Sequence, residues 1–133
     1  MTVYFSLFFL FLIIAFLQKE RVIKYSTALK LVFSILAIYG AIRYNYGSDY
    51  ASYLLFHEQI LDDTYTGRII EVGYFWLNKL LPNFYFVTGV TSLLISYSYY
   101  KVFKNYVIPN YLWVAILLLF LNTMFLIGQY SRI

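Results

Sequence analysis

The sequence is poor in several residue types on which small soluble and secreted domains depend. It has no cysteine, one histidine, two prolines and six glycines among 133 residues. The lack of cysteine excludes a disulfide framework, a thiolate nucleophile and a cysteine-containing zinc site. Only 12% of the residues are charged, about half the share that a water-exposed surface normally carries. This composition is a poor fit to a soluble globular domain.

The scarcity and scatter of charge also bear on partners. The net charge is +4, but the basic residues are spread among apolar runs and form no continuous patch, so we expect no nucleic-acid partner. Asp62 and Asp63 are adjacent carboxylates, and a solvated turn explains them better than a metal site. We expect neither a metal ion nor a cofactor.

Hydrophobic residues are abundant, at 62% of the chain, and gather in long runs. A helix needs about 20 mainly apolar residues to cross a membrane, and four stretches approach this length: residues 2–17, 25–42, 83–100 and 111–128. The first is interpreted as an uncleaved span, because its basic cluster follows the apolar run, whereas a signal peptide has it in front. The predicted fold is an all-α, multi-span integral membrane helical bundle.

The distribution of charge predicts the orientation of this bundle. Lysine and arginine dominate residues 18–30 and 101–110, whereas residues 43–82 carry five of the six acids. Basic loops stay in the cytoplasm during membrane insertion. We therefore predict that the two basic loops are cytoplasmic and that the N-terminus and residues 43–82, the outer segment, lie outside.

The outer segment is too long for a simple connection and too rich in aromatic and aliphatic residues for a disordered one. A first group of its residues recurs at helical spacing: Tyr50, Tyr53, Leu54, His57 and Leu61. A second apolar stripe covers residues 69–81. We predict one or two short interfacial or re-entrant helices on the outer face. His57 is expected to be packed or hydrogen-bonded rather than catalytic.

Two stretches of the outer segment resemble the motifs of a known family. Residues 43–53 read RYNYGSDYASY and resemble the Arg-Tyr-x-x-Gly-x-Asp-Tyr-x-x-Tyr signature of EpsG-type, Wzy-like polysaccharide polymerases. Residues 71–81 read EVGYFWLNKLL and are similar to the Glu-Pro-Gly-Phe-x-x-Leu-Asn-Lys-Leu segment that follows in that family. The tail at residues 128–132 is similar to the approach to a third motif, which contains an external arginine.

The resemblance implies a function, a substrate and a location. Such polymerases join oligosaccharide repeat units, carried on polyprenyl diphosphate, at the external face of the bacterial cytoplasmic membrane during exopolysaccharide or O-antigen synthesis. Family members are multi-span proteins of several hundred residues, so residues 1–133 would form a single transmembrane domain from the N-terminal part of a longer glycosyltransferase. That part alone is expected to be inactive. The implied partners are the lipid-linked oligosaccharide, the bilayer and other polysaccharide-assembly membrane proteins.

The resemblance also indicates the residues of the site. Arg43 is the candidate ligand of the diphosphate, because guanidinium groups bind phosphate bidentately, and Arg132 is a second candidate cation. Asp49 and Glu71 are the candidate catalytic carboxylates; which of them is the base stays open, and Asp49 also fits a helix N-cap. The last two candidates are Tyr50 and Tyr53, whose aromatic rings suit either stacking on a sugar or anchoring at the membrane interface.

Two other functions stay open. One is a non-catalytic small membrane protein that serves as an accessory or scaffold for a larger partner. The other is a fragment of a transporter or flippase, which is disfavoured because Lys30 is the single clear charge within the predicted spans. A coding frame that continues beyond Ile133 into further spans would favour the polymerase, and a stop there would favour the accessory protein.

Overall fold

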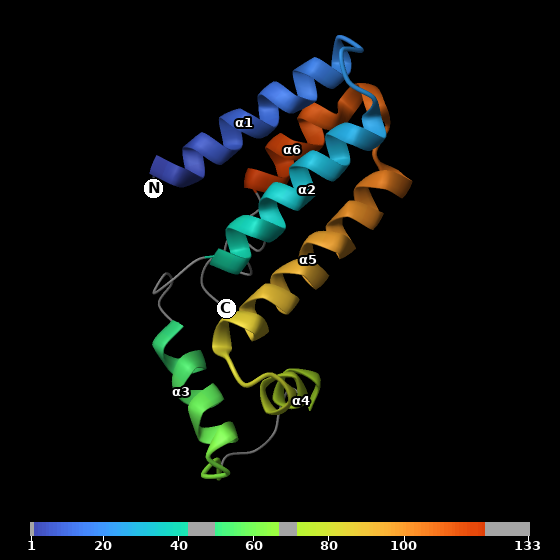
Figure 1. The fold of residues 1–133 in the computed structure, drawn as a ribbon. Helices are drawn as coiled ribbons and strands as arrows, with labels where there is room; N and C mark the ends of the chain where they lie inside the picture. Colours follow the sequence, from blue (N-terminus) through green and yellow to red (C-terminus); the bar gives the residue numbers. More distant parts are fainter. Residues whose placement is uncertain (1, 43–49, 67–71, 122–133) are drawn as a thin grey trace.

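The computed structural model describes residues 2–42, 50–66 and 72–121, and these fold mainly into helices (Figure 1). The elements are, in order, α1 (Thr2–Lys19), α2 (Tyr25–Ile42), α3 (Tyr50–Leu61), α4 (Val72–Leu80), α5 (Phe84–Tyr106), the 3-10 turn η1 (Pro109–Tyr111) and α6 (Leu112–Leu121). The prediction of an all-helical chain is confirmed over this part of the sequence. Four helices, α1, α2, α5 and α6, lie together, and α3 and α4 lie beyond one end of them (Figure 1).

Helices α2 and α5 form the most extensive contact and run in opposite directions. The contact uses small side chains: the Ser92 hydroxyl donates to the Ala37 carbonyl oxygen over 3.1 Å, in a buried position. Nearer the end of α2, a Cβ added at Gly89 would lie 3.9 Å from the Cβ of Ala41. Small residues allow two helix backbones to come close, which favours dispersion contacts and hydrogen bonds between helices.

The other end of the α2–α5 pair is fastened by Tyr25. Its hydroxyl lies 2.8 Å from the carbonyl oxygens of both Phe103 and Val107 and shares its one proton between them. The Phe103 carbonyl already accepts the N–H of the C-cap residue Val107 over 3.0 Å, so the Tyr25 hydroxyl adds a second partner there and supplies one to the Val107 carbonyl at the open end of α5. The turn that precedes α2 and the turn that follows α5 therefore lie at the same end of the molecule.

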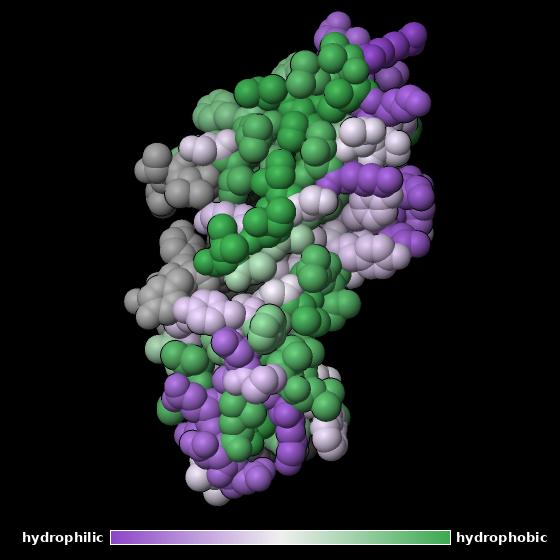
Figure 2. Space-filling view, viewed as in Figure 1, coloured by the Kyte–Doolittle hydropathy of each residue, from purple (hydrophilic) through white to green (hydrophobic). Residues whose placement is uncertain are grey.

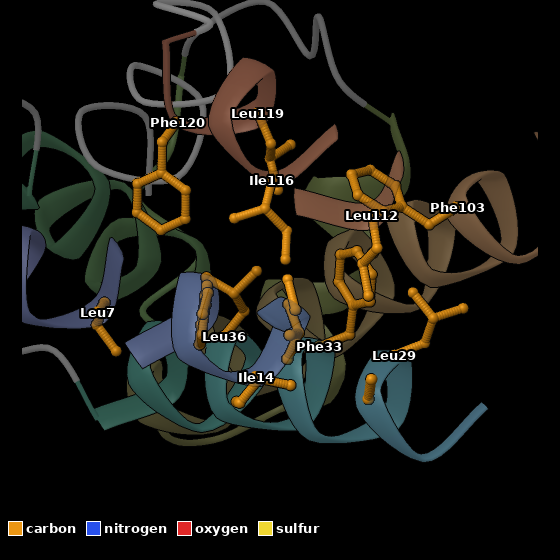
Figure 3. Packing of buried hydrophobic residues seen from close by; sticks show 14 residues of the cluster. Leu7, Ile14, Leu29, Phe33, Leu36, Phe103, Leu112, Ile116, Leu119 and Phe120 are labelled. Carbon is orange, nitrogen blue, oxygen red and sulfur yellow. The ribbon is translucent and has the colours of Figure 1, made fainter. Parts of the chain in front are cut away.

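Helices α1 and α6 pack on each other and complete the core (Figure 3). Several aromatic rings of the core meet edge-on; among them, Phe33 and Phe103 have ring centroids 5.1 Å apart, and Phe11 and Phe120 have centroids 5.7 Å apart. Edge-to-face pairs of this kind are favourable beyond the area that they bury. The largest side chains that are almost fully enclosed in this core are Phe11, Leu29, Leu36, Leu112 and Ile116.

Two helices end in left-handed turns that satisfy their open carbonyls. After α1, Arg21 has a φ of 60°, and the N–H of Val22 donates to the Leu17 carbonyl over 2.9 Å. Asp63, with a φ of 52°, has the corresponding place after α3. These are Schellman-type ends, in which glycine is the usual residue, and Arg21 and Asp63 accept the strain of a positive φ instead.

Helix α5 extends beyond the predicted span at one end. It starts as the sequence indicates, because the Asn83 side chain caps it by accepting from the N–H of Tyr85 over 2.9 Å. It ends at Tyr106 rather than at residue 100, so Lys101 and Lys104 lie on the helix and not in the loop. Lysine is a good helix former, and no helix breaker occurs before Pro109.

The surface of the described part is unusually apolar. By length and hydropathy, α2 is the one described helix that qualifies alone as a membrane span; Phe5–Lys19 and Pro109–Leu121 are apolar but shorter. Large apolar side chains project from α1 into the surroundings, with Phe5 56% and Phe9 60% exposed. Figure 2 shows this hydrophobic surface over the upper part of the molecule and more hydrophilic surface over its two ends. Extended apolar surfaces face lipid or another protein.

The α2–α5 contact predicts that substitutions at two serines of α5 have very different effects on stability. Replacing buried Ser92 with leucine (Ser92→Leu) forces a large side chain between the helices and removes a hydrogen bond, so we expect a loss of about 1–3 kcal/mol in the free energy of unfolding. Ser98→Leu makes the same change on an exposed face, where Ser98 bonds only its own helix, and is expected to cost less than about 0.5 kcal/mol. Thermal unfolding of both variants in detergent measures the difference. Equal losses would contradict the close α2–α5 contact.

Candidate functional site

Helices α3 and α4 carry the described parts of the two family-like stretches and join at a cluster of apolar side chains. We call this the outer cluster; its buried members are Tyr50, Phe84 and Val87, and the residues packed around them are Tyr53, Leu54, Tyr74, Leu77 and Leu81. Phe84 and Val87 belong to the first turn of α5. The outer cluster therefore fastens both short helices to the end of the bundle where α5 begins.

Tyr50 starts α3 and connects it to α5. Its side chain is 6% exposed, and its ring meets the ring of Phe84 edge-on with centroids 5.5 Å apart. At this end of the bundle α2 also terminates, because Ala41 of α2 faces Gly89 of α5. The chain therefore leaves the bundle after Ile42 and is back beside it at Tyr50.

Tyr53 connects α3 to α4. Its ring meets the ring of Tyr74 edge-on with centroids 5.6 Å apart. The ring of Phe56 is stacked on the ring of Tyr74, with centroids 5.9 Å apart. One residue of the second family-like stretch is thus in contact with two side chains of α3.

A buried hydrogen bond between His57 and Asn78 completes the junction of α3 and α4. His57 is 3% exposed and Asn78 is 0% exposed, and the histidine Nδ1 lies 2.9 Å from the asparagine Oδ1. The Asn78 Nδ2 donates to the Tyr74 carbonyl oxygen over 2.7 Å, which leaves Oδ1 to accept from the imidazole. His57 therefore carries its hydrogen on Nδ1 when neutral, and Nε2 is its basic nitrogen.

The interpretation of His57 as a hydrogen-bonded core residue is confirmed by this geometry. Its ring also lies against Phe84, with centroids 5.6 Å apart. Asn78 was not singled out from the sequence, although it falls inside residues 71–81. The Leu-Asn-Lys-Leu part of the second family-like stretch, which includes Asn78, is the available signal, but nothing in the sequence pairs Asn78 with a histidine 21 positions away.

An ion pair joins the end of α4 to the turn that follows α3. The Lys79 ammonium lies 3.3 Å from a carboxylate oxygen of Asp63, and both side chains are largely exposed. Exposed pairs of this kind contribute between zero and about 1 kcal/mol. The His57–Asn78 hydrogen bond is buried, so water cannot substitute for it if it breaks. It therefore contributes more than the ion pair to fixing the position of α3 against α4. The pairing also gives Asp63 a role other than metal binding.

The candidate site residues divide into two groups. Tyr50 and Tyr53 are in contact with the outer cluster, and their binding of sugar stays a prediction. Arg43, Asp49, Glu71 and Arg132 lie outside the described residues. Within the described ranges no group of three or more histidine, aspartate or glutamate side chains is arranged to hold a metal ion.

Comparison with known proteins gives no match: no protein-family model, no curated protein and no solved structure is significantly similar to this chain.

The His57–Asn78 bond predicts a large effect of a small truncation. Asn78→Ala leaves the Nδ1–H of buried His57 without an acceptor, so we expect the free energy of unfolding to fall by about 1–3 kcal/mol. Asn105→Ala, on the exposed last turn of α5, is the matched control and should cost less than about 0.5 kcal/mol. Thermal unfolding in detergent separates the two. An Asn78→Ala variant as stable as the control would refute the proposed role of this bond.

Proposed function

We propose that this chain is the N-terminal part of a membrane polysaccharide polymerase, a glycosyltransferase that joins oligosaccharide repeat units carried on polyprenyl diphosphate. The observation that carries the proposal is the packing of the two family-like stretches on each other. Tyr53 of the first stretch contacts Tyr74 of the second, and His57 of the same helix is hydrogen-bonded to Asn78. Stretches that act at one site have to be brought together in this way.

The ends of these stretches connect the proposed site to the bundle. Arg43 is bonded to Ile42, the last residue of α2, and Asp49 is bonded to Tyr50, which packs on the first residue of α5. The short chain between them starts and ends at the same end of the bundle. This arrangement supports the proposal that Arg43 and Asp49 bind the same substrate.

A multi-span membrane bundle is part of the proposal. The apolar side chains exposed on α1 and the span-length helix α2 support contact with lipid. The orientation is supported by the position of charge: the basic turn before α2 and the last turns of α5, which carry Lys101 and Lys104, share one end of the bundle, as the Tyr25 hydrogen bonds require. Glu58, Asp62 and Asp63 of the described acids lie with α3 at the other end (Figure 1). An excess of lysine and arginine on the cytoplasmic side is the usual distribution in membrane proteins.

The proposed chemistry is a substitution at an anomeric carbon. A hydroxyl of one repeat unit attacks that carbon of the growing chain, a new glycosidic C–O bond forms, and the C–O bond to the lipid diphosphate breaks. The diphosphate leaves with the electron pair, and its charge is stabilised by Arg43 and by Arg132. Asp49 or Glu71 accepts the proton of the attacking hydroxyl.

The outer cluster supports this chemistry by its rigidity. A site is precise when its side chains are placed by packed elements rather than by free loops. Asp49 and Glu71 immediately precede α3 and α4, and those helices are held by the outer cluster and by the His57–Asn78 bond. Tyr53, which is half-buried between the helices, is the aromatic residue best placed to contact a sugar at the rim.

Binding of the lipid diphosphate tests the proposal without requiring turnover. The purified chain in nanodiscs is expected to bind polyprenyl diphosphate more tightly than the matching polyprenol, because charge-assisted hydrogen bonds are worth about 1.5–3 kcal/mol. Arg43→Ala should then weaken binding of the diphosphate by about tenfold or more. Arg21→Ala, which removes the same charge from the basic turn after α1, should leave it unchanged.

Two results would contradict the proposal. The first is equal affinity for the diphosphate and the polyprenol. The second is a loss on Arg21→Ala as large as that on Arg43→Ala, which would place the lipid diphosphate at the basic end and favour a different function.

A further inference from the structure

A groove opens between α2 and α5, away from the outer cluster. Its volume is about 300 Å³, and its walls are formed by Phe33 and Ala37 of α2 and by Leu93, Tyr97 and Tyr100 of α5. This size is at the lower end of the range for small-molecule sites. The walls are apolar, so the groove suits a hydrocarbon chain.

One buried polar group in the groove has no protein partner. Ser96 lines the groove with 3% of its surface exposed, and its hydroxyl oxygen makes no hydrogen bond to the described part of the chain. Other hydroxyls of α5 bond their own helix: Thr91 donates to Val87, and Ser98 donates to Leu94. A buried hydroxyl without a partner is costly, and a polar atom of a bound molecule would remove that cost.

One ammonium group lines the groove, and two more lie over the rings of tyrosines that line it. Lys30 belongs to its lining. The ammonium of Lys101 lies 5.5 Å from the ring centroid of Tyr97, and that of Lys104 lies 6.0 Å from the ring centroid of Tyr100. Both tyrosines line the groove. Within residues 2–42, 50–66 and 72–121 none of the three lysines has an ion-pair partner, since the ion pair recorded there joins Lys79 to Asp63. Figure 2 shows hydrophilic side chains beside the apolar surface over α2 and α5.

We infer that this groove binds an anionic phospholipid. The phosphate lies among the ammonium groups of Lys30, Lys101 and Lys104, one acyl chain lies between Phe33 and Leu93, and the Ser96 hydroxyl donates to an oxygen of the lipid. Apolar walls, with Lys30 in the lining and two further lysines over its tyrosines, match a ligand that has an apolar tail and a negative head. The groove lies toward the basic end of the bundle, so this site is separate from the proposed polymerase site and does not depend on that function.

The inference is tested by lipid competition with the full chain. Native mass spectrometry of the protein in mixed micelles is expected to show at least a fivefold preference for phosphatidylglycerol over phosphatidylcholine. Each lysine near an anionic headgroup contributes about fivefold to binding. The triple variant Lys30→Gln, Lys101→Gln, Lys104→Gln should therefore lose the preference. The matched control Lys19→Gln, Arg21→Gln, Lys24→Gln removes three charges from the same end of the molecule and should retain it.

A second variant tests the groove itself. Ser34 is exposed and lines the groove, so Ser34→Phe fills it without disturbing the core; bound phosphatidylglycerol should fall at least threefold. Ser98→Phe adds the same ring to an exposed position that does not line the groove and should have no effect. The inference is overturned if the two triple variants lose the preference equally, if Ser34→Phe binds as the wild type does, or if polyprenyl monophosphate displaces phosphatidylglycerol from the same lysines.

Discussion

The antiparallel contact of α2 and α5 is the constraint on which the rest of the structure depends. It is fastened at one end by Tyr25 on the last carbonyls of α5 and in its middle by Ser92 on the Ala37 carbonyl. Because α2 ends where α5 begins, the chain between them has to return to the point that it left. The outer segment therefore leaves and rejoins the bundle at the same end. Within it, α3 and α4 pack there through their apolar side chains.

The stability of α3 and the stability of α4 depend on the contacts between the two helices. Helices of 12 and 9 residues are too short to be stable alone, since isolated helices need about 12–15 residues even to be marginal. They gain stability from the outer cluster and from the His57–Asn78 bond. The same contacts bring the two family-like stretches together. In the proposed polymerase, structural stability and placement of the site residues thus come from one set of interactions.

The sequence predicts the helices of this protein better than it predicts their arrangement. The bounds of α2 follow directly from an apolar run between charges, and two short helices lie in the outer segment where helical spacing indicated them. The span predicted over residues 83–100 belongs to a longer helix, because helix propensity carries the backbone past Lys101 to Tyr106. Hydropathy shows that α1 is apolar but does not predict that it packs on α6. Packing between helices that are distant in sequence depends on the complementary shapes of their side chains.

The site is harder to predict than the helices for a related reason. Motif spacing indicated Tyr50 and Tyr53, and the structure places both in the contacts that hold α3. Asn78 gains its importance from a partner in another helix, and no periodicity reveals such a pair. Arg43, Asp49, Glu71 and Arg132 lie outside the described residues, so their roles continue to rest on the resemblance and on the neighbours to which they are bonded.

The most direct test of the account is a distance between the two family-like stretches in the intact membrane. The chain has no cysteine of its own, so the pair Tyr53→Cys and Tyr74→Cys can be joined by a short bifunctional maleimide without background. We predict efficient cross-linking of this pair and none of a control pair, Tyr53→Cys with Tyr111→Cys, which lie at opposite ends of the molecule. Failure of the first pair to cross-link, while each single cysteine still reacts with a monofunctional maleimide, would contradict the central claim that α3 and α4 bring the two stretches together.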